Sequence, residues 1–148
     1  MRVVLQRVKT GAVYVEGQLI NEIHSGYVLL IGMTAGDTEQ TVEKVANKLL
    51  GLRIWDDSDG KMNLALDKNS QEILAISQFT LYANIKKGKR PSFVEALEPI
   101  EANKLYEYFC KYCNTQGYQI KKGVFGAMMD IHLINDGPVT IIIDSDTL

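Results

Sequence analysis

Two short stretches of the sequence combine residue types that suit ester chemistry or tight ligand binding. The first occupies residues 77–82, where the apolar run 73–76 ends, and it is rich in hydroxyl and amide side chains. Such groups beside a buried strand cost free energy unless they find partners, so the cluster suggests a site. The second occupies residues 135–140, where Pro138 removes a backbone donor between two strand-like runs.

The chemistry available to the first stretch is limited by the lack of an evident base. Hydrolysis of an ester needs an attacking water or hydroxyl, stabilisation of the oxyanion and a proton for the leaving oxygen. There is no G-x-S-x-G elbow, and neither His24 nor His132 falls in a motif that pairs it with a serine or cysteine. Thr80 is therefore a weak candidate nucleophile. The alternative is that Ser77, Gln78 and Thr80 only satisfy backbone groups at a strand end.

Length and composition predict one domain spanning residues 1–148. A chain of 148 residues with 46% hydrophobic content can bury a single sizeable core. The 16 basic and 18 acidic residues give a net charge of -2, so any contact with nucleic acid must be local. Charges interrupt the first eight residues too early for a signal sequence, and no apolar run reaches membrane-spanning length, so we expect a cytoplasmic protein.

The cysteines and the acidic loop do not predict a metal or redox site. Cys110 and Cys113 form a C-x-x-C late in a helical pattern, where zinc would lack two further ligands, so we expect them to pack in the core. Residues 56–60 resemble part of a calcium loop, but Trp55 and Leu66 stand where an EF-hand requires oxygen ligands. We therefore expect no metal and no cofactor.

Apolar periodicity predicts the elements that must position these stretches. Helices are expected at about 38–50 and 99–116, the second with Pro99 in its first turn. The continuous apolar run 26–32 predicts a central strand. The other expected strands cover residues 2–8, 12–16, 18–23, 52–55, 61–66, 73–78, 118–122, 127–134 and 139–144. Because the strands come mostly as meanders, we predict an α+β domain with mainly antiparallel sheets in a barrel-like or two-layer core.

The segment 83–92 reads as a basic loop. Its four cations surround Gly88 and are Lys86, Lys87, Lys89 and Arg90. They could meet nucleic-acid phosphates, a local contact that is compatible with a negative net charge. The alternative is a solvated surface, which is what most charge runs provide.

Taken together, these stretches resemble the signatures of the D-aminoacyl-tRNA deacylase family. The resemblance is carried by residues 77–81, 87–93 and 135–140, with supporting matches at 59–63 and 125–127. It covers the whole chain from Met1 to the last strand. Several motifs in the family's order argue against chance agreement.

The resemblance implies a homodimeric cytoplasmic enzyme that hydrolyses the ester between a D-amino acid and the terminal adenosine of tRNA. It also implies the clearance of glycine from mischarged tRNA. In that family the Gly-Pro peptide is cis and reaches into the active site of the other subunit, where its carbonyl oxygens define the chiral gate. That role falls here to Gly137 and Pro138. Phe125, Ala127 and Met129 would line the adenine pocket, with core packing as an alternative for Met129.

The resemblance also implies a catalytic segment formed by Ser77, Gln78, Phe79 and Thr80. Backbone N-H groups there, helped by Gln78, would hold the oxyanion. We expect water to attack with help from the ribose 2'-hydroxyl, while Thr80 positions the substrate without forming an acyl-enzyme. Two alternatives stay open: a related deacylase with a trans Gly-Pro peptide that acts on L-aminoacyl-tRNA, and a non-catalytic module that binds the RNA end.

Overall fold

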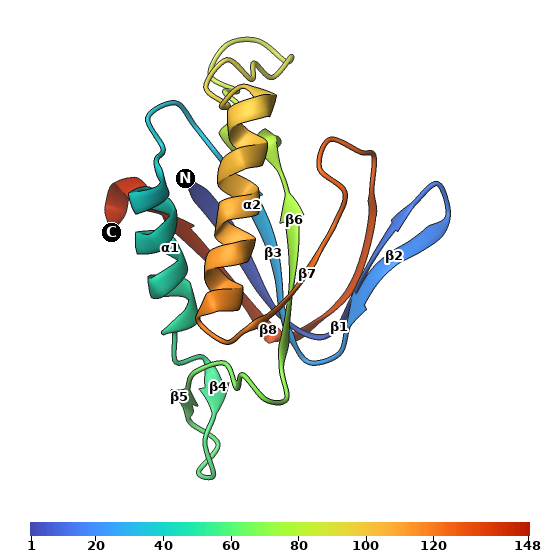
Figure 1. Cartoon of the computed structure of the whole chain (residues 1–148), viewed down its shortest axis with the longest axis vertical. Helices are drawn as coiled ribbons and strands as arrows, with labels where there is room; N and C mark the ends of the chain where they lie inside the picture. The colour runs from blue at the N-terminus through green and yellow to red at the C-terminus, as the bar shows by residue number, and fades with distance from the viewer.

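Six strands build the main sheet, and two helices cover one of its faces (Figure 1). The computed structural model describes all residues, 1–148. In chain order the elements are β1 (Arg2–Val15), β2 (Gln18–Ile23), β3 (Gly26–Gly32), α1 (Glu39–Leu50), β4 (Trp55–Asp56), β5 (Met62–Leu64), β6 (Glu72–Ser77), the 3-10 turn η1 (Phe79–Tyr82), α2 (Pro99–Thr115), β7 (Gln119–Lys122), β8 (Asp130–Asp144) and the 3-10 turn η2 (Ser145–Thr147). The predicted α+β class with two main helices is confirmed.

The long strand β1 organises the sheet. One of its edges pairs with β8, and its other edge pairs with β3 and then with β2, all antiparallel. The sheet continues from β3 to β6 and β7 through two parallel pairings. At its ends, Asn21 of β2 donates to the carbonyl of Lys122 of β7 at 2.7 Å, and Lys121 of β7 donates to the carbonyl of Glu22 at 2.7 Å. These contacts curl the sheet into a nearly closed barrel.

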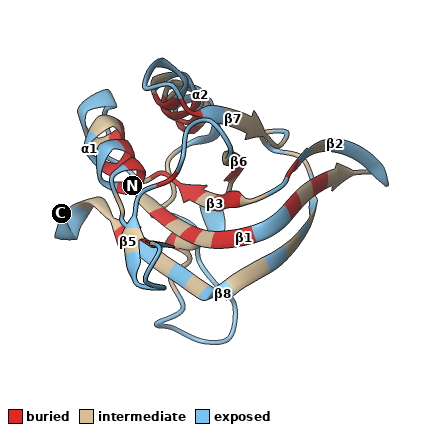
Figure 2. Cartoon of the chain, turned by 90° about the horizontal axis from the view of Figure 1, so that it is seen from below, coloured by how far each residue is buried: buried red, intermediate tan, exposed pale blue.

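The curled sheet has two separate apolar cores. Figure 2 shows buried positions in red along β1 and β3 and on the helices. The larger core lies between the sheet and the helices and contains the fully buried Tyr27, Tyr106 and Phe109. The smaller core fills the barrel and consists of Val8, Val13, Ile23, Val28, Leu74 and Ile76. As predicted, β3 is central, because it lies between β1 and β6 and contributes to both cores.

Both helices begin where the sequence predicts. Thr38 caps α1, its hydroxyl accepting a hydrogen bond from the Thr41 backbone, and Glu98 caps α2 directly before Pro99. The two cysteines are free thiols that face the larger core, which confirms the packing expected for them. No helix is both long and apolar enough to span a membrane.

Three sequence predictions need correction. Residues 2–8 and 12–16 form the single strand β1, and residues 127–134 and 139–144 fall largely within the single strand β8. The connection expected at residues 135–138 is a bulge inside β8. Val8 pairs with Asn135 and Gln6 with Thr140, so four residues of β8 stand opposite one residue of β1. Periodicity could not show this, because the continuous partner strand keeps both halves of β8 in one ladder.

Candidate active site

The polar cluster lies where β6 ends and the chain turns into η1. The backbone N-H of Gln78 donates to the carbonyl of Ile31 at 2.7 Å, which ties the turn to β3. Ser77 and Gln78 are half-buried, whereas Phe79 and Thr80 are exposed. The side chain of Gln78 donates to the hydroxyl of Thr80 at 2.5 Å and does not cap η1. The first N-H groups of a helical turn lack intrahelical partners, so this is a suitable place to hold an oxyanion.

No imidazole reaches this segment. His132 packs at a tilt against Tyr14, with ring centroids 4.9 Å apart and planes at 41°, beside the distal half of β1. The backbone N-H of His24 donates to Glu72, at the opposite end of β6 from Ser77. The only side-chain hydrogen bond within residues 77–80 joins an amide to a hydroxyl. The segment can therefore bind and polarise a carbonyl, but it carries no general base.

The residues expected around the adenine lie beside the C-terminal end of β6. Gly123 donates to the carbonyl of Ala75 at 3.0 Å, and the hydroxyl of Tyr106 donates to the same oxygen at 2.8 Å. Phe125 packs against the ring of Tyr106, with centroids 5.9 Å apart. Met129 lies so close to Gly123 that an added Cβ would come within 2.7 Å of its sulfur. Phe125, Ala127 and Met129 are all half-buried.

The Gly137–Pro138 peptide bond is cis, and both residues are exposed on the bulge of β8. Arg7 of the neighbouring strand β1 holds this bulge in place. Its Nε donates to the carbonyl of Asp136 at 3.2 Å and lies 3.4 Å from the Asp136 carboxylate, while its Nη1 donates to the carbonyl of Ile54 at 2.6 Å. Arg7 is the only buried charged residue, and its planar fork can serve several acceptors at once.

A second set of polar side chains closes the base of the bulge. Asn135 accepts a hydrogen bond from the backbone of Val139 at 3.0 Å and donates to Gln6, which also accepts from Thr140 at 2.6 Å. Gln6 and Arg7 were not predicted as site residues from the sequence. A signal was present, since Val3, Leu5 and Arg7 alternate on one face of β1 and place a charge in line with core residues.

One chain does not bring the two predicted site elements together. Arg7, opposite the bulge, pairs with Tyr27, which pairs with Ile73, and Ser77 lies four residues further along β6. At ~3.3 Å per residue along the strand and ~4.8 Å for each of the three strand spacings, Pro138 and Ser77 are about 20 Å apart on the sheet.

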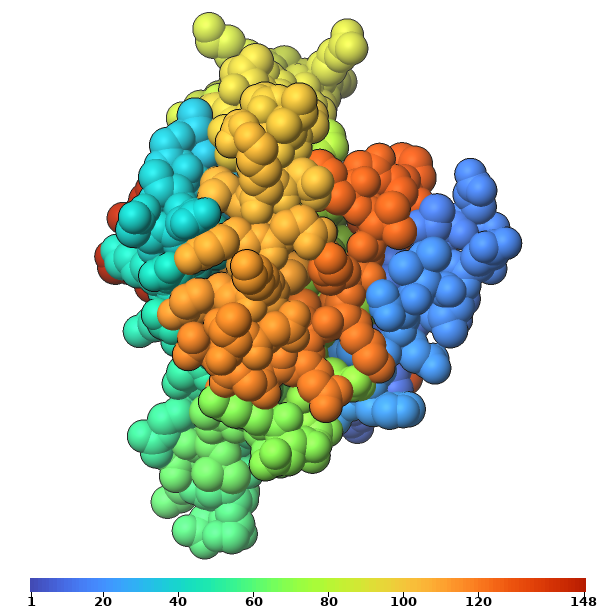
Figure 3. All heavy atoms as spheres, in the orientation of Figure 1, coloured from blue at the N-terminus to red at the C-terminus, as the bar shows by residue number.

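The basic loop directly follows η1 and the segment that is predicted to be catalytic. Its ends are joined by two backbone hydrogen bonds between Asn84 and Ser92, of 2.7 and 2.9 Å. The four cations of residues 86–90 are exposed and form no ion pair within the chain. Figure 3 shows this part of the chain, coloured yellow-green, at one end of the molecule with side chains projecting into solvent.

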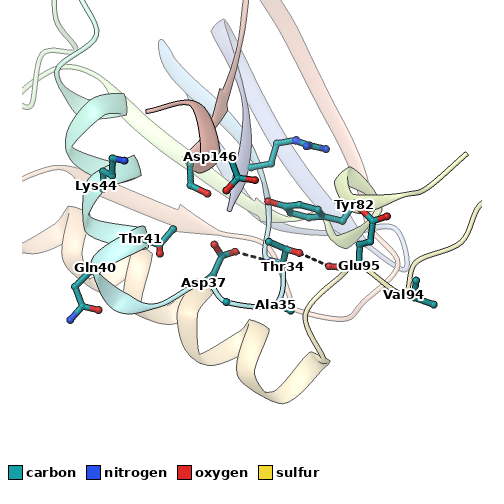
Figure 4. A pocket seen from close by; sticks show the side chains of 13 residues that line it. Thr34, Ala35, Asp37, Gln40, Thr41, Lys44, Tyr82, Val94, Glu95 and Asp146 are labelled. Carbon is teal, nitrogen blue, oxygen red and sulfur yellow. Dashed lines mark hydrogen bonds between the residues drawn. The ribbon is translucent and has the colours of Figure 1, made fainter. Parts of the chain in front are cut away.

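A separate polar cavity of about 820 Å³ lies between the start of α1, η2 and the segment after Phe93 (Figure 4). Thr34 connects two lining segments of this cavity. Its backbone N-H donates to the Asp37 carboxylate at 2.8 Å, and its hydroxyl donates to the carbonyl of Glu95 at 2.6 Å. The buried Tyr82 hydroxyl has no partner, and burial together with the charge of Asp37 raises its pKa. None of the predicted site residues lines this cavity.

Comparison with known proteins agrees with the arrangement of these motifs. A family model described as D-Tyr-tRNA(Tyr) deacylase matches residues 4–144. The D-aminoacyl-tRNA deacylase of Aquifex aeolicus (strain VF5) is 50% identical over 145 residues, covering 98% of each chain. That of Brevibacillus brevis is 50% identical over 146 residues, covering 98% of this chain and all of the other.

A solved structure has the same fold as this chain. The chain described as "c-Myc DNA Unwinding Element Binding Protein" superposes with a TM-score of 0.91 at 37% identity, covering 97% of this chain and 98% of that one. Fold, motifs and full-length sequence identity therefore lead to one assignment. This chain belongs to the D-Tyr-tRNA(Tyr) deacylase family.

Proposed function

We propose that the protein hydrolyses the ester bond of D-aminoacyl-tRNA in the cytoplasm, releasing the free amino acid and tRNA. Glycine on mischarged tRNA is a second substrate, and L-aminoacyl-tRNA is rejected. Family membership supports the reaction class, and the polar turn at the end of β6 supplies a place for the scissile carbonyl. The protein would thus act as a chiral proofreading enzyme in translation.

The observation that carries this proposal is the exposed, braced bulge at Gly137 and Pro138. Nothing in its own chain covers it, and the catalytic segment of the same chain lies about 20 Å away by strand geometry. We propose that the bulge of one copy closes over residues 77–80 of a second copy. Ile134 and Ile142 of β8 are 58% and 68% exposed on either side of the bulge, and they offer apolar surface for such a homodimer.

Chirality would be decided by exclusion at this bulge. Arg7 holds the bulge through the carbonyl of Asp136, and Asn135 holds it through the backbone N-H of Val139. The carbonyl oxygens of Gly137 and Pro138 can then accept hydrogen bonds from the α-amine of a D-residue, whose side chain points outward. The L-enantiomer would direct its side chain into the edge of Pro138. Exclusion of one hand tolerates any D side chain and also glycine.

In the chemical step, water adds to the acyl carbon while backbone N-H groups at the start of η1 hold the developing oxyanion. The bond between the acyl carbon and the ribose 3'-oxygen then breaks. The 3'-oxygen receives the water's proton through the adjacent 2'-hydroxyl, since residues 77–80 carry no base. Gln78 and Thr80, hydrogen-bonded to each other, position the substrate.

The remaining contacts hold the RNA end. Phe125, Ala127 and Met129 lie beside β6 and would line the pocket for the terminal adenine. The exposed cations of residues 86–90 would meet backbone phosphates, because they have no partner in the chain.

The test is deacylation of D-Tyr-tRNA, L-Tyr-tRNA and Gly-tRNA by the pure protein. Rapid loss of D-tyrosine and glycine with L-tyrosine spared is the expected result. Rapid loss of L-tyrosine would instead identify a related deacylase without the chiral gate. Binding of all three without hydrolysis would identify a non-catalytic module for the RNA end.

A further inference from the structure

An exposed aromatic pair joins the catalytic segment to the chain that follows the basic loop. Phe79 is 56% and Phe93 is 39% exposed, with ring centroids 5.1 Å apart and planes at 70°. In such an edge-to-face pair one ring contributes only its edge to the contact, so a ring face stays open to solvent. Large apolar rings left in water lose the free energy that burial would provide. The pair is therefore a candidate contact surface for a ligand.

Two tethered segments hold the rings in place. Phe79 begins η1 and stands between Gln78 and Thr80 in the sequence. Phe93 follows the basic loop and comes directly after Ser92, whose backbone is paired with Asn84. Phe79 thus belongs to the catalytic segment, and Phe93 follows the four cations of residues 86–90 in the chain.

The surroundings of the pair favour single-stranded RNA as its ligand. Proteins hold unpaired nucleotides by stacking bases on aromatic rings while cations meet the phosphates, and both components are present here on neighbouring segments of the chain. The proposed homodimer places the bulge of a second copy over residues 77–80, but a second copy is a poorer match for Phe93, because the centres of protein interfaces are depleted of charged residues and four like charges precede this ring in the chain.

We propose that Phe79 and Phe93 form a stacking platform for the unpaired nucleotides that precede the terminal adenosine of tRNA. This inference rests on the proposed function, which brings the RNA end to residues 77–80. The adenosine lies on the side of Phe125, and the strand leaves the site over the aromatic pair toward the basic loop. Stacking is indifferent to base identity, so the platform serves every tRNA alike.

A fluorescence measurement tests the platform without any catalysis. An uncharged acceptor-stem RNA carries 2-aminopurine next to the terminal adenosine, and stacking quenches this base. The wild-type protein and Phe93→Tyr should quench it, whereas Phe93→Ala should not. The matched control is Val94→Ala, because Val94 is 87% exposed in the same loop and has no ring. Full quenching by Phe93→Ala, or equal loss in Val94→Ala, would overturn the proposal.

Kinetics provide the second arm. Phe93→Ala should raise KM for D-Tyr-tRNA about tenfold, the effect of losing one stacked base, and should leave hydrolysis of 3'-O-D-tyrosyl-adenosine unchanged. Equal losses with both substrates, or a change of oligomeric state in Phe93→Ala, would contradict the platform. If the wild-type protein hydrolyses neither substrate but still quenches the RNA, the proposed function fails while the platform stands.

Discussion

The Nε of Arg7 donates a hydrogen bond of 3.2 Å to the carbonyl of Asp136, the residue directly before Gly137. The same guanidinium donates to the carbonyl of Ile54 at the start of the β4–β5 hairpin and lies over the ring of Trp55, 5.3 Å from its centroid. A single buried cation thus connects the N-terminal strand, the hairpin and the bulge of β8. This gives the bulge a fixed position relative to the sheet.

Replacing Arg7 should therefore affect both stability and activity. Arg7→Ala leaves the carbonyls of Asp136 and Ile54 without their donor and should lower the free energy of unfolding by roughly 3 kcal/mol. Urea denaturation measures this loss. Arg7→Lys keeps the charge but not the planar fork, so it should recover part of the stability and little of the D-Tyr-tRNA hydrolysis. Full activity of Arg7→Lys would show that the fork is not needed.

Gly137→Ala should damage the site by displacing the bulge. Gly137 has φ 122°, which L side chains rarely adopt, and an added Cβ would lie 2.9 Å from Cγ2 of Val139 and 3.0 Å from Nη2 of Arg7. A shift of about 1 Å at a binding surface can cost about 100-fold, so we expect a loss of that order in kcat/KM for D-Tyr-tRNA.

The matched control is Gly60→Ala in the β4–β5 hairpin. Gly60 also has a positive φ, 72°, but a Cβ added there would meet no atom within 4 Å. This variant should lose a little stability and keep its activity. Comparable losses of activity in both variants would mean that backbone strain alone, and not the place of Gly137, explains the effect.

Thr80→Ala should slow deacylation without abolishing it. Thr80 is exposed and its hydroxyl is hydrogen-bonded to the amide of Gln78, with no base nearby to activate it. We expect single-turnover rates to fall by about tenfold, the loss of one positioning contact of about 1.4 kcal/mol. Mass spectrometry of quenched reactions should reveal no acyl group on Thr80.

A substrate with a 2'-deoxy terminal ribose provides the contrasting measurement. If the 2'-hydroxyl relays the proton, this substrate should react about 100-fold or more slowly, the usual size of a general acid-base contribution. Normal rates with the deoxy substrate, or complete loss of turnover in Thr80→Ala with binding retained, would contradict the proposed chemistry.

Neutralising the basic loop should change the salt dependence of tRNA binding. Each phosphate contact adds about 0.7 to 0.9 to the slope of log affinity against log salt. Replacing Lys86, Lys87, Lys89 and Arg90 by glutamine should lower the slope by up to about 3. Fluorescence anisotropy at several salt concentrations measures this slope. An unchanged slope would show that the loop is solvated surface that makes no phosphate contacts.

Because the two thiols are buried, we expect the free energy of unfolding to fall at alkaline pH. Burial raises the pKa of Cys110 and of Cys113 from 9.0 to about 12, because the thiolate is poorly solvated in the core. The folded pKa lies above the unfolded one, so the thiols favour the folded state below pH 9, and this contribution falls away as pH rises from 9 toward 12.

Urea titrations at about pH 7 and about pH 10 measure this loss. The double variant Cys110→Ala, Cys113→Ala should be less stable at neutral pH because of the lost packing, and its stability should fall less between the two conditions. Rapid alkylation of the wild-type thiols in the native state would contradict their burial.

Much of the fold could be predicted because local patterns govern it. The apolar stripe around Val42 and Val45 sets α1, Pro99 marks the start of α2, and the continuous run 26–32 marks the central strand. The family was also recognisable from short motifs such as residues 77–81 and 135–140. These features depend on residues that are close together in the chain.

What the sequence by itself determined is the set of elements, the family and the residue types of the site. Only the tertiary structure decided that residues 136–139 bulge from one continuous strand, that Arg7 holds this bulge, and that the bulge and Ser77 lie on different parts of the sheet. The physical reason is that strand register and the partner of a buried charge arise from contacts between distant segments, which no local pattern encodes.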